Sequence, residues 1–280
     1  MNGMFFAAGM AAILCVLLIT VYMFVAGLPA MGRIGLEDFL LGRVWASTAA
    51  RPLYGILPFI LTSFFGTLGA VLLGVPVGLF TSVFLSKMAP AGLSRLVGGA
   101  VELLAGIPSV VYGLIGMTML VPLVADLFHL PSGACLLAAI LVLAVMILPS
   151  IVSVSVTALK AVPSEYEEAS LALGATKTET YFKVSIPAAK SGIAAGVVLG
   201  IGRAMGEAMA VMMVAGNVAN MPGLFQSVRF LTTAIASEMS YASGLQRQAL
   251  FSIALVLFLF IMALNAFLNR VLKGGSKDDA

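Results

Sequence analysis

One polar stretch interrupts an otherwise apolar chain: AVPSEYEEASLALGATKTETYFKVSIPAAK, residues 161–190. It lies between the fourth and fifth long apolar runs, and it is the only long segment with the composition of a soluble helical hairpin. In a chain that otherwise resembles a membrane protein, this hairpin is the segment that a water-soluble partner could bind. We therefore expect a membrane subunit that is driven from outside its own sequence.

The composition excludes an ordinary water-soluble domain. Of the 280 residues, 61% are hydrophobic and only 10% are charged, whereas soluble domains contain about 25% charged residues. Six apolar runs are long enough to cross about 30 Å of hydrocarbon as helices. They cover residues 5–27, 56–85, 99–124, 134–159, 192–216 and 248–272. The sequence therefore predicts an all-α, polytopic membrane protein with six transmembrane helices.

The first apolar run could instead be a cleaved signal peptide. No Lys or Arg precedes it, and it is longer than the usual apolar core of such peptides, which favours a retained span. We expect three segments in the chain. They are residues 1–55, a first transmembrane helix and outer loop; residues 56–272, a core of five transmembrane helices that includes the hairpin; and residues 273–280, a polar C-terminal tail.

Basic residues predict the orientation, because Lys and Arg are enriched in cytoplasmic loops. More of them lie on the cytoplasmic side if both termini and the hairpin are placed there. The net charge of +3 comes without a basic stripe, so we expect no nucleic-acid partner. Cys15, Cys135 and His129 show no disulfide or metal-binding spacing, and we expect no metal site.

The hairpin carries two helix-start signals and one helix-stop signal. Ser164-Glu165-Tyr166-Glu167 and Thr176-Lys177-Thr178-Glu179 both fit the capping box, in which the first hydroxyl and the last carboxylate satisfy amide groups. Gly174 can adopt the left-handed conformation that ends a helix. We expect a first short helix over 165–173 and a second one after Thr176. Together they could plug a groove on a partner, or they could form a re-entrant or merely structured loop.

Arg203 lies well inside the fifth apolar run. A charge in mid-membrane costs about 2.5–3.5 kcal/mol on insertion scales, so we expect this residue to face the helix bundle and to have a partner. Glu207, four residues later, would share its helix face. The two could form an ion pair that only fixes packing. Alternatively, the Arg203 guanidinium could bind a tetrahedral oxyanion in transit, with Glu207 holding it in place.

The hairpin also carries a family pattern. Glu168-Ala169-Ser170, Gly174 after three intervening residues, and Val184-Ser185-Ile186-Pro187 after nine more resemble the EAA loop of ABC importer permeases. In that family the loop docks on a cytoplasmic ATPase. The resemblance therefore implies that Glu168, Ala169 and Gly174 lie at an ATPase contact, and Tyr166 is an aromatic candidate on the same helix. No GxxxxGK[ST] phosphate-binding loop occurs in the chain, so we expect no enzyme activity, with ATP and Mg held by the partner ATPase.

Three further stretches resemble the permeases of phosphate importers, and two of them resemble the PstC type. They are residues 104–113, 202–211 and 228–239. The first contains Pro108, which should kink its helix, and it places Ser109 and Tyr112 with Arg203 and Glu207 as candidates for the substrate path.

The resemblance implies a type I ABC importer permease fold in a bacterial plasma membrane. It also implies three partners: a PstA-like sister permease, two copies of an ATPase subunit and an extracytoplasmic phosphate-binding protein. Loops 28–54 and 217–247 are candidates for receiving that protein.

Two alternatives remain open from the sequence. A permease of the same fold could carry another oxyanion, such as molybdate, sulfate or phosphonate. An ATP-independent anion carrier is the other alternative, although it would have no use for the hairpin.

Overall fold

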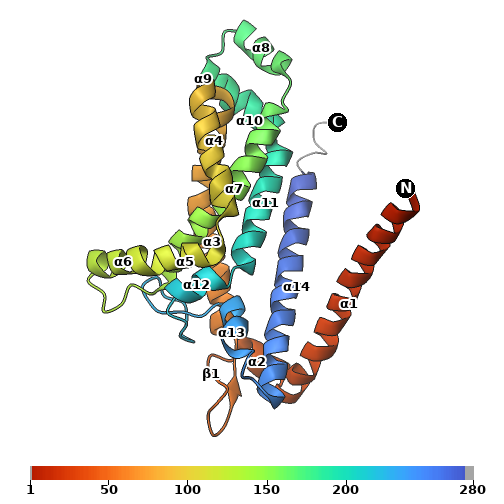
Figure 1. Ribbon diagram of the computed structural model, residues 1–280, viewed down its shortest axis with the longest axis vertical. Helices are drawn as coiled ribbons and strands as arrows, with labels where there is room; N and C mark the ends of the chain where they lie inside the picture. Colours follow the sequence, from red (N-terminus) through yellow and green to blue (C-terminus); the bar gives the residue numbers. More distant parts are fainter. Residues whose placement is uncertain (1, 275–280) are drawn as a thin grey trace.

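The computed structural model describes residues 2–274 as an elongated bundle of helices (Figure 1). The expected polar tail lies outside these residues, except for positions 273 and 274. In chain order the elements are α1 (Asn2–Ile34), α2 (Leu36–Leu41), β1 (Trp45–Ala46), β2 (Leu53–Tyr54), α3 (Leu57–Val83), η1 (Phe84–Met88), α4 (Ala91–Gly106), α5 (Ser109–Ile115), η2 (Gly116–Leu120), α6 (Val121–Phe128), α7 (Leu136–Lys160), α8 (Ser164–Ala172), α9 (Lys177–Thr180), η3 (Tyr181–Ser185), α10 (Ile186–Ala188), α11 (Lys190–Gly206), α12 (Met209–Val214), α13 (Leu231–Glu238) and α14 (Gly244–Gly274).

Within the described residues, five helices are long and apolar enough to cross a membrane. A sixth candidate is the bent pair Lys177–Ala188 and Lys190–Gly206, whose two parts meet at 72°. This agrees with a polytopic, all-α protein of about six spans. Two of the predicted spans, 99–124 and 192–216, are nevertheless not single helices, since each one breaks near its middle.

Helix α7 is the centre of the bundle, and α3 and α11 pack against it through glycines. A Cβ atom on Gly74 of α3 would lie 2.7 Å from the Cδ1 of Ile147, and one on Gly192 of α11 would lie 2.4 Å from the Cβ of Ala158. Both distances are shorter than real Cβ contacts, so a larger residue would force Ile147 to move at Gly74 and would push the helices apart at Gly192. The small residues at four-residue spacing therefore serve helix packing, as such spacing does in membranes.

Helix α1 leaves the bundle as it runs towards its N-terminal end (Figure 1). Its C-terminal half packs on α14, where the Tyr22 and Phe251 rings meet edge to face with centroids 5.7 Å apart. Most of its other apolar side chains are exposed. A surface of this kind suits lipid or another membrane subunit rather than water.

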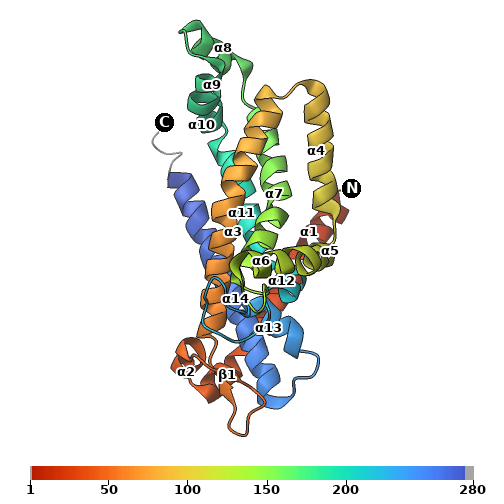
Figure 2. The same cartoon turned by 90° about the vertical axis from the view of Figure 1, so that its left-hand side faces the viewer.

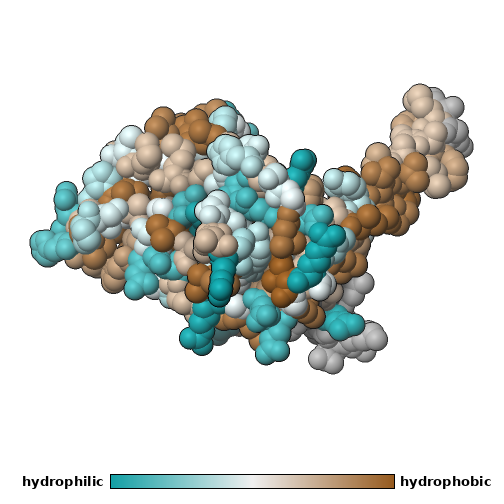
Figure 3. Space-filling model, turned by 90° about the horizontal axis from the view of Figure 1, so that it is seen from below, coloured by the Kyte–Doolittle hydropathy of each residue, from teal (hydrophilic) through white to brown (hydrophobic). Residues whose placement is uncertain are grey.

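The end of the molecule opposite α8 is built around one carboxylate, that of Glu238. It pairs with Arg229 at 2.6 Å and accepts hydrogen bonds from Trp45 and Gln246 at 3.0 Å. These contacts tie the β1–β2 hairpin, α13 and α14 together. Figure 3 looks at this end and shows hydrophilic residues gathered over it, with the hydrophobic arm of α1 beside it.

Candidate functional site

The third predicted span breaks completely at Pro108. Helix α4 ends at Gly106, and Ile107 is extended (φ −68°, ψ 127°), as expected for a residue before proline. The chain then continues as α5, η2 and α6, which lie across the direction of α7 in both views (Figures 1 and 2). The expected kink is therefore a change of direction of the whole chain.

The fifth predicted span breaks at Glu207. Helix α11 ends at Gly206, Glu207 is extended (φ −73°, ψ 132°), and α12 begins at Met209. The prediction that Glu207 shares a helix face with Arg203 is therefore wrong. Instead of pairing with Arg203, the Glu207 carboxylate accepts a hydrogen bond from the Ala210 amide at 3.0 Å. It thus satisfies a free N–H group at the start of α12, as a cap does.

The two breaks meet in the interior. Helices α5 and α12 are in such close contact that a Cβ atom on Gly113 would lie 2.8 Å from the Cα of Ala210. The buried Tyr112 donates its hydroxyl to the Leu104 carbonyl at 2.7 Å, across the first break. Thr232 of α13 donates to the Glu207 carbonyl at 2.6 Å, at the second. We call these two interruptions, together with the residues that contact them in space, the break region.

Side chains satisfy part of the backbone of the break region. Broken helices leave unpaired N–H and C=O groups, which are tolerated at membrane depth only where the protein satisfies them or where they line a cavity. Tyr112 and Glu207, both predicted as substrate-path residues, are occupied in this way. The structure therefore brings them together as residues that hold the breaks in place.

Arg203 lies in the last turn of α11, where a positive charge is favoured by the helix dipole. Its side chain is half-buried and close enough to Tyr112 for the two to interact electrostatically. Among residues 2–274 the guanidinium has neither a hydrogen-bond partner nor a carboxylate within ion-pair distance. Ser109, at the start of α5, is also half-buried, and its hydroxyl makes no hydrogen bond to the described part of the chain. These two groups remain available to a ligand.

The hairpin 161–190 has the expected helices but only one of the two expected caps. Helix α8 covers Ser164–Ala172, and Gly174 is left-handed (φ +88°). The Thr176 box is present, with the Glu179 carboxylate accepting from the Thr176 amide at 3.0 Å. The Ser164 box is absent because Pro163 takes the cap position and Glu167 is engaged elsewhere.

Glu167 joins the hairpin to the end of the α3 span. Its Oε1 lies 2.5 Å from the Lys87 ammonium of η1 and accepts a hydrogen bond from Ser185 of η3 at 2.8 Å. A second tie joins the Ser170 and Thr180 hydroxyls at 2.9 Å. The sequence analysis missed these ties, since no local pattern relates Lys87 to a carboxylate eighty positions away.

The predicted docking residues all lie on the free surface of the hairpin. Tyr166 is 55% exposed, and Glu168, Ala169 and Gly174 are exposed beside it. Leu173, next to Gly174, is 91% exposed. Helix α8 forms one tip of the molecule (Figure 1), so a partner could reach this surface without touching the spans.

A helical membrane protein with broken spans around an interior arginine, and with an exposed polar hairpin at one end, is typical of a membrane subunit of a transporter. The model of the family described as "binding-protein-dependent transport system inner membrane component" matches residues 74–274. The chain belongs to this family.

Curated ABC transporter permeases are similar to this chain over most of its length. A "Probable ABC transporter permease protein YqgH" from Bacillus subtilis is 39% identical over 261 residues, which cover 90% of this chain and 84% of the relative. The "Phosphate transport system permease protein PstC" of Pasteurella multocida is 38% identical, covering 75% and 70%. That of Mesorhizobium japonicum is 33% identical, covering 97% and 90%.

Solved structures share the fold. A chain of the MetNI methionine ABC transporter matches with a TM-score of 0.58 and 22% identity, covering 79% of this chain and 94% of that chain. A chain of a bacterial ABC transporter for alginate import matches with a TM-score of 0.57 and 14% identity, covering 94% and 95%. The chain thus has the type I ABC importer permease fold. It is a multi-pass inner-membrane component of a transporter rather than an enzyme, and it works in a complex with a separate ATPase.

Proposed function

We propose that this chain is one permease subunit of an ATP-driven importer of inorganic phosphate. The observation that carries the proposal is the half-buried Arg203, which has no counterion among residues 2–274 and lies where two broken spans meet. A mid-membrane cation is costly, and a tetrahedral oxyanion is the ligand that a guanidinium fork fits best. The names of the PstC relatives support phosphate as that anion.

The proposed complex contains a sister permease of the PstA type beside this chain. Two ATPase subunits, which hold ATP and Mg, contact the hairpin through Tyr166, Glu168, Ala169 and Gly174. An extracytoplasmic phosphate-binding protein docks at the opposite end, on loops 28–54 and 217–247. Both termini then lie on the cytoplasmic side. This agrees with the direction of α1 and α14, since the N-terminal end of α1 and the C-terminal end of α14 point to the side of α8 (Figure 1).

Two connections can carry movement from the hairpin into the spans. The first is covalent: η3 and α10 lead through a 72° bend into α11, whose last turn holds Arg203. The second is the Glu167–Lys87 pair, which joins α8 to η1 at the end of α3. When ATP closes the ATPase dimer, a displacement of α8 therefore moves two of the helices that pack on α7. The break region opens alternately to the two sides.

The roles within the break region divide between ligand contact and support. In this proposal the Arg203 guanidinium and the Ser109 hydroxyl face the anion. Tyr112 and Glu207 act as positioning residues, because their polar groups hold the ends of α4 and α12. A weak site with few contacts suits a transporter, since the anion must leave as well as enter.

Replacing Arg203 by Gln tests the proposal in the reconstituted complex. A hydrogen bond to a charged group contributes about 1.5–3 kcal/mol, so we expect phosphate uptake at low substrate concentration to fall at least tenfold. Arg203→Lys keeps the positive charge but loses the planar guanidinium that can donate two parallel hydrogen bonds, so this variant should retain part of the uptake. Normal uptake by Arg203→Gln would contradict an anion contact, provided that both variants assemble and hydrolyse ATP.

Competition identifies the anion. Unlabelled phosphate should suppress the uptake of labelled phosphate at far lower concentration than sulfate, molybdate or phosphonate. Stronger suppression by one of these would assign the same fold and site to a different oxyanion. Uptake without any ATPase subunit would contradict the coupling role of the hairpin.

A further inference from the structure

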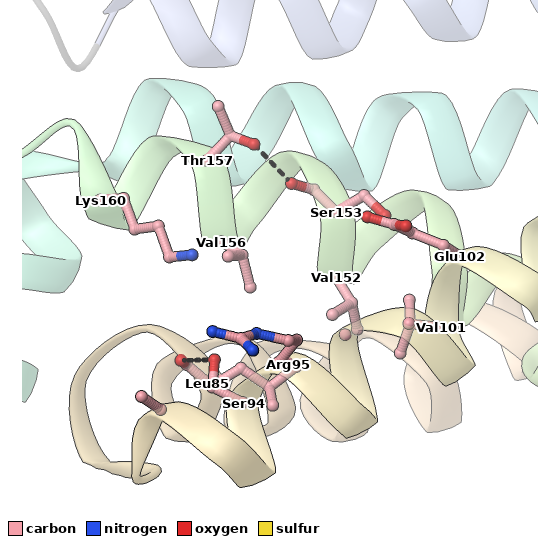
Figure 4. Close-up of a pocket in the computed structure, with 13 residues that line it drawn as sticks. Leu85, Ser94, Arg95, Val101, Glu102, Val152, Ser153, Val156, Thr157 and Lys160 are labelled. Atoms are coloured by element: carbon pink, nitrogen blue, oxygen red, sulfur yellow. Dashed lines mark hydrogen bonds between the residues drawn. The ribbon is translucent and has the colours of Figure 1, made fainter.

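A cavity with polar side chains lies between α4 and α7, at the end of the molecule that carries α8 (Figure 4). Its volume is about 710 Å³. Six of its lining side chains carry a charge or a hydroxyl. They are Ser94, Arg95 and Glu102 from α4, with Ser153, Thr157 and Lys160 from α7. We call this cavity the α4–α7 cleft.

Two cations face this cleft from opposite walls. Figure 4 shows the Arg95 guanidinium and the Lys160 ammonium both directed into the space between the helices. Within residues 2–274 neither has a carboxylate within ion-pair distance or a hydrogen-bond acceptor. Two like charges that share a cavity repel each other, so an anion between them would be stabilised by both.

Hydroxyl groups and one carboxylate also line the cleft and restrict where an anion could bind. The Thr157 hydroxyl donates to the Ser153 carbonyl at 2.9 Å, whereas the Ser153 hydroxyl has no hydrogen-bond partner in the described chain. Glu102 lies towards the far end of the cleft from Lys160 (Figure 4). The cleft thus carries its two cations nearer the Lys160 end and its carboxylate nearer the other end (Figure 4). An anion in it would be favoured near the two cations and disfavoured near Glu102.

The cleft is distinct from the break region. From Arg95 to the end of α4 at Gly106 the helix rises ~17 Å at 1.5 Å per residue. Lys160 is the last residue of α7, so it lies at the depth where lysine side chains reach the membrane surface. Valine side chains at 101, 152 and 156 line the wall beside the cations.

We propose that the α4–α7 cleft is a binding site for a phosphate group, held between Arg95 and Lys160. Guanidinium and ammonium groups both recognise phosphate by charge-assisted hydrogen bonds. The group has two sources at this position: inorganic phosphate in the cytoplasm and the head group of an anionic lipid such as phosphatidylglycerol. The apolar wall suits an acyl chain, and the open mouth suits a free ion. The inference does not depend on which solute the permease carries.

The experiment uses the full complex in nanodiscs, with Arg203→Gln in every sample so that the break region does not contribute. One arm measures binding of radiolabelled inorganic phosphate in phosphatidylcholine nanodiscs. The other measures retention of phosphatidylglycerol from mixed nanodiscs by native mass spectrometry. We expect Arg95→Gln and Lys160→Gln each to weaken binding about tenfold in one arm, and the arm that responds identifies the source.

Two matched variants make the result decisive. Glu102→Gln removes the negative charge from the same cleft and should tighten binding a few-fold in the responding arm. Arg247→Gln removes an exposed cation at the opposite end of the molecule and should leave binding unchanged. The proposal is overturned if neither arm shows binding, or if Arg247→Gln weakens it as much as Arg95→Gln does.

Discussion

The break region and the hairpin both hold short helices at fixed angles, but they do so by different bonds. In the break region side chains satisfy backbone groups, through Tyr112 to Leu104, Glu207 to Ala210 and Thr232 to Glu207. In the hairpin the Thr176 box is a local cap of the same kind, but the ties between helices join side chains to one another, through Lys87, Ser185 and Glu167 and through Ser170 and Thr180.

The difference follows from where water can reach. Tyr112 and Ala210 belong to the apolar cluster around α7, where an unpaired backbone group would find no other partner. The α8 helix has no buried residue, so water can reach the α8 side of these ties. We therefore expect ties in the break region to contribute mainly to stability, and ties in the hairpin to contribute mainly to coupling.

The largest effect on stability is expected from Glu207→Ala. It leaves the Ala210 amide unsatisfied beside an apolar cluster, which costs about 2 kcal/mol. Glu207→Gln is the matched control, because its side-chain carbonyl can still accept the hydrogen bond. Denaturant unfolding in detergent should separate the two variants. If both lose the same stability, the carboxylate charge matters rather than the cap.

A smaller loss is expected from Tyr112→Phe. This change keeps the ring and its packing but removes the hydrogen bond to the Leu104 carbonyl, at a cost of about 1 kcal/mol. The same unfolding assay measures it. Phosphate uptake should fall only modestly, because Tyr112 holds the break rather than the anion. A loss of uptake as large as that of Arg203→Gln, with stability unchanged, would instead place the hydroxyl on the substrate.

The sequence predicted a kink at the position of the first break and missed the second break, for a physical reason. Proline restricts the residue before it, so Pro108 marks the first break locally. At Glu207 the apolar run continues on both sides without proline, and a four-residue spacing from Arg203 is what a continuous helix would show. That break is visible only once α12 packs against α5 and α13. Glycines recur at four-residue spacing in the second and fifth apolar runs, but the helix that they pack against, α7, is seen only in the structure.

In the hairpin, Lys87→Gln should lower stability by less than about 1 kcal/mol. The Lys87 and Glu167 side chains are 12% and 20% exposed, so solvent screens part of their attraction. The coupling between ATP hydrolysis and transport should be affected more than the stability, because the pair joins α8 to the α3 span. We expect more ATP hydrolysed per phosphate transported in the reconstituted complex.

Lys183→Gln is the control for Lys87→Gln. Lys183 pairs with Glu179 at 3.7 Å on the open surface, where its side chain is 76% exposed. It should leave the ratio of hydrolysis to transport unchanged. An equal change in both variants would show that the hairpin responds to charge in general and not to the tie between α8 and α3.

The hairpin also shows that tertiary contacts decide whether a capping pattern in the sequence forms a capping box in the structure. Thr176 and Glu179 form the predicted box on an exposed turn, where Lys183 approaches Oε1 of Glu179 and leaves Oε2 to accept from the Thr176 amide. Ser164 and Glu167 have the same spacing, but Lys87 and Ser185 approach Glu167 and take its carboxylate. Tertiary contacts of this kind cannot be predicted from one local pattern. The exposure of the predicted docking residues, in contrast, followed from the composition of the segment.

The smallest effect is expected from acidification of the Thr176 box. Hydrogen bonds from the Thr176 amide and hydroxyl, with the nearby Lys183 charge, lower the pKa of Glu179 below its ordinary value of 4.5. A carboxylate with a lowered pKa stabilises the fold fully above its unfolded pKa, and this contribution is lost as the pH falls through the lowered value.

Protection of the amides in α9 against hydrogen exchange should therefore decrease only below pH 4.5, while α11 and the break region keep theirs. Glu179→Gln keeps an acceptor that does not titrate, so its protection factors should not change over this range. Equal pH dependence in both proteins would mean that the box does not hold this helix start. The Ser170–Thr180 and Glu167 ties alone would then stabilise the hairpin. Its stability would come from contacts between its helices and not from a local cap.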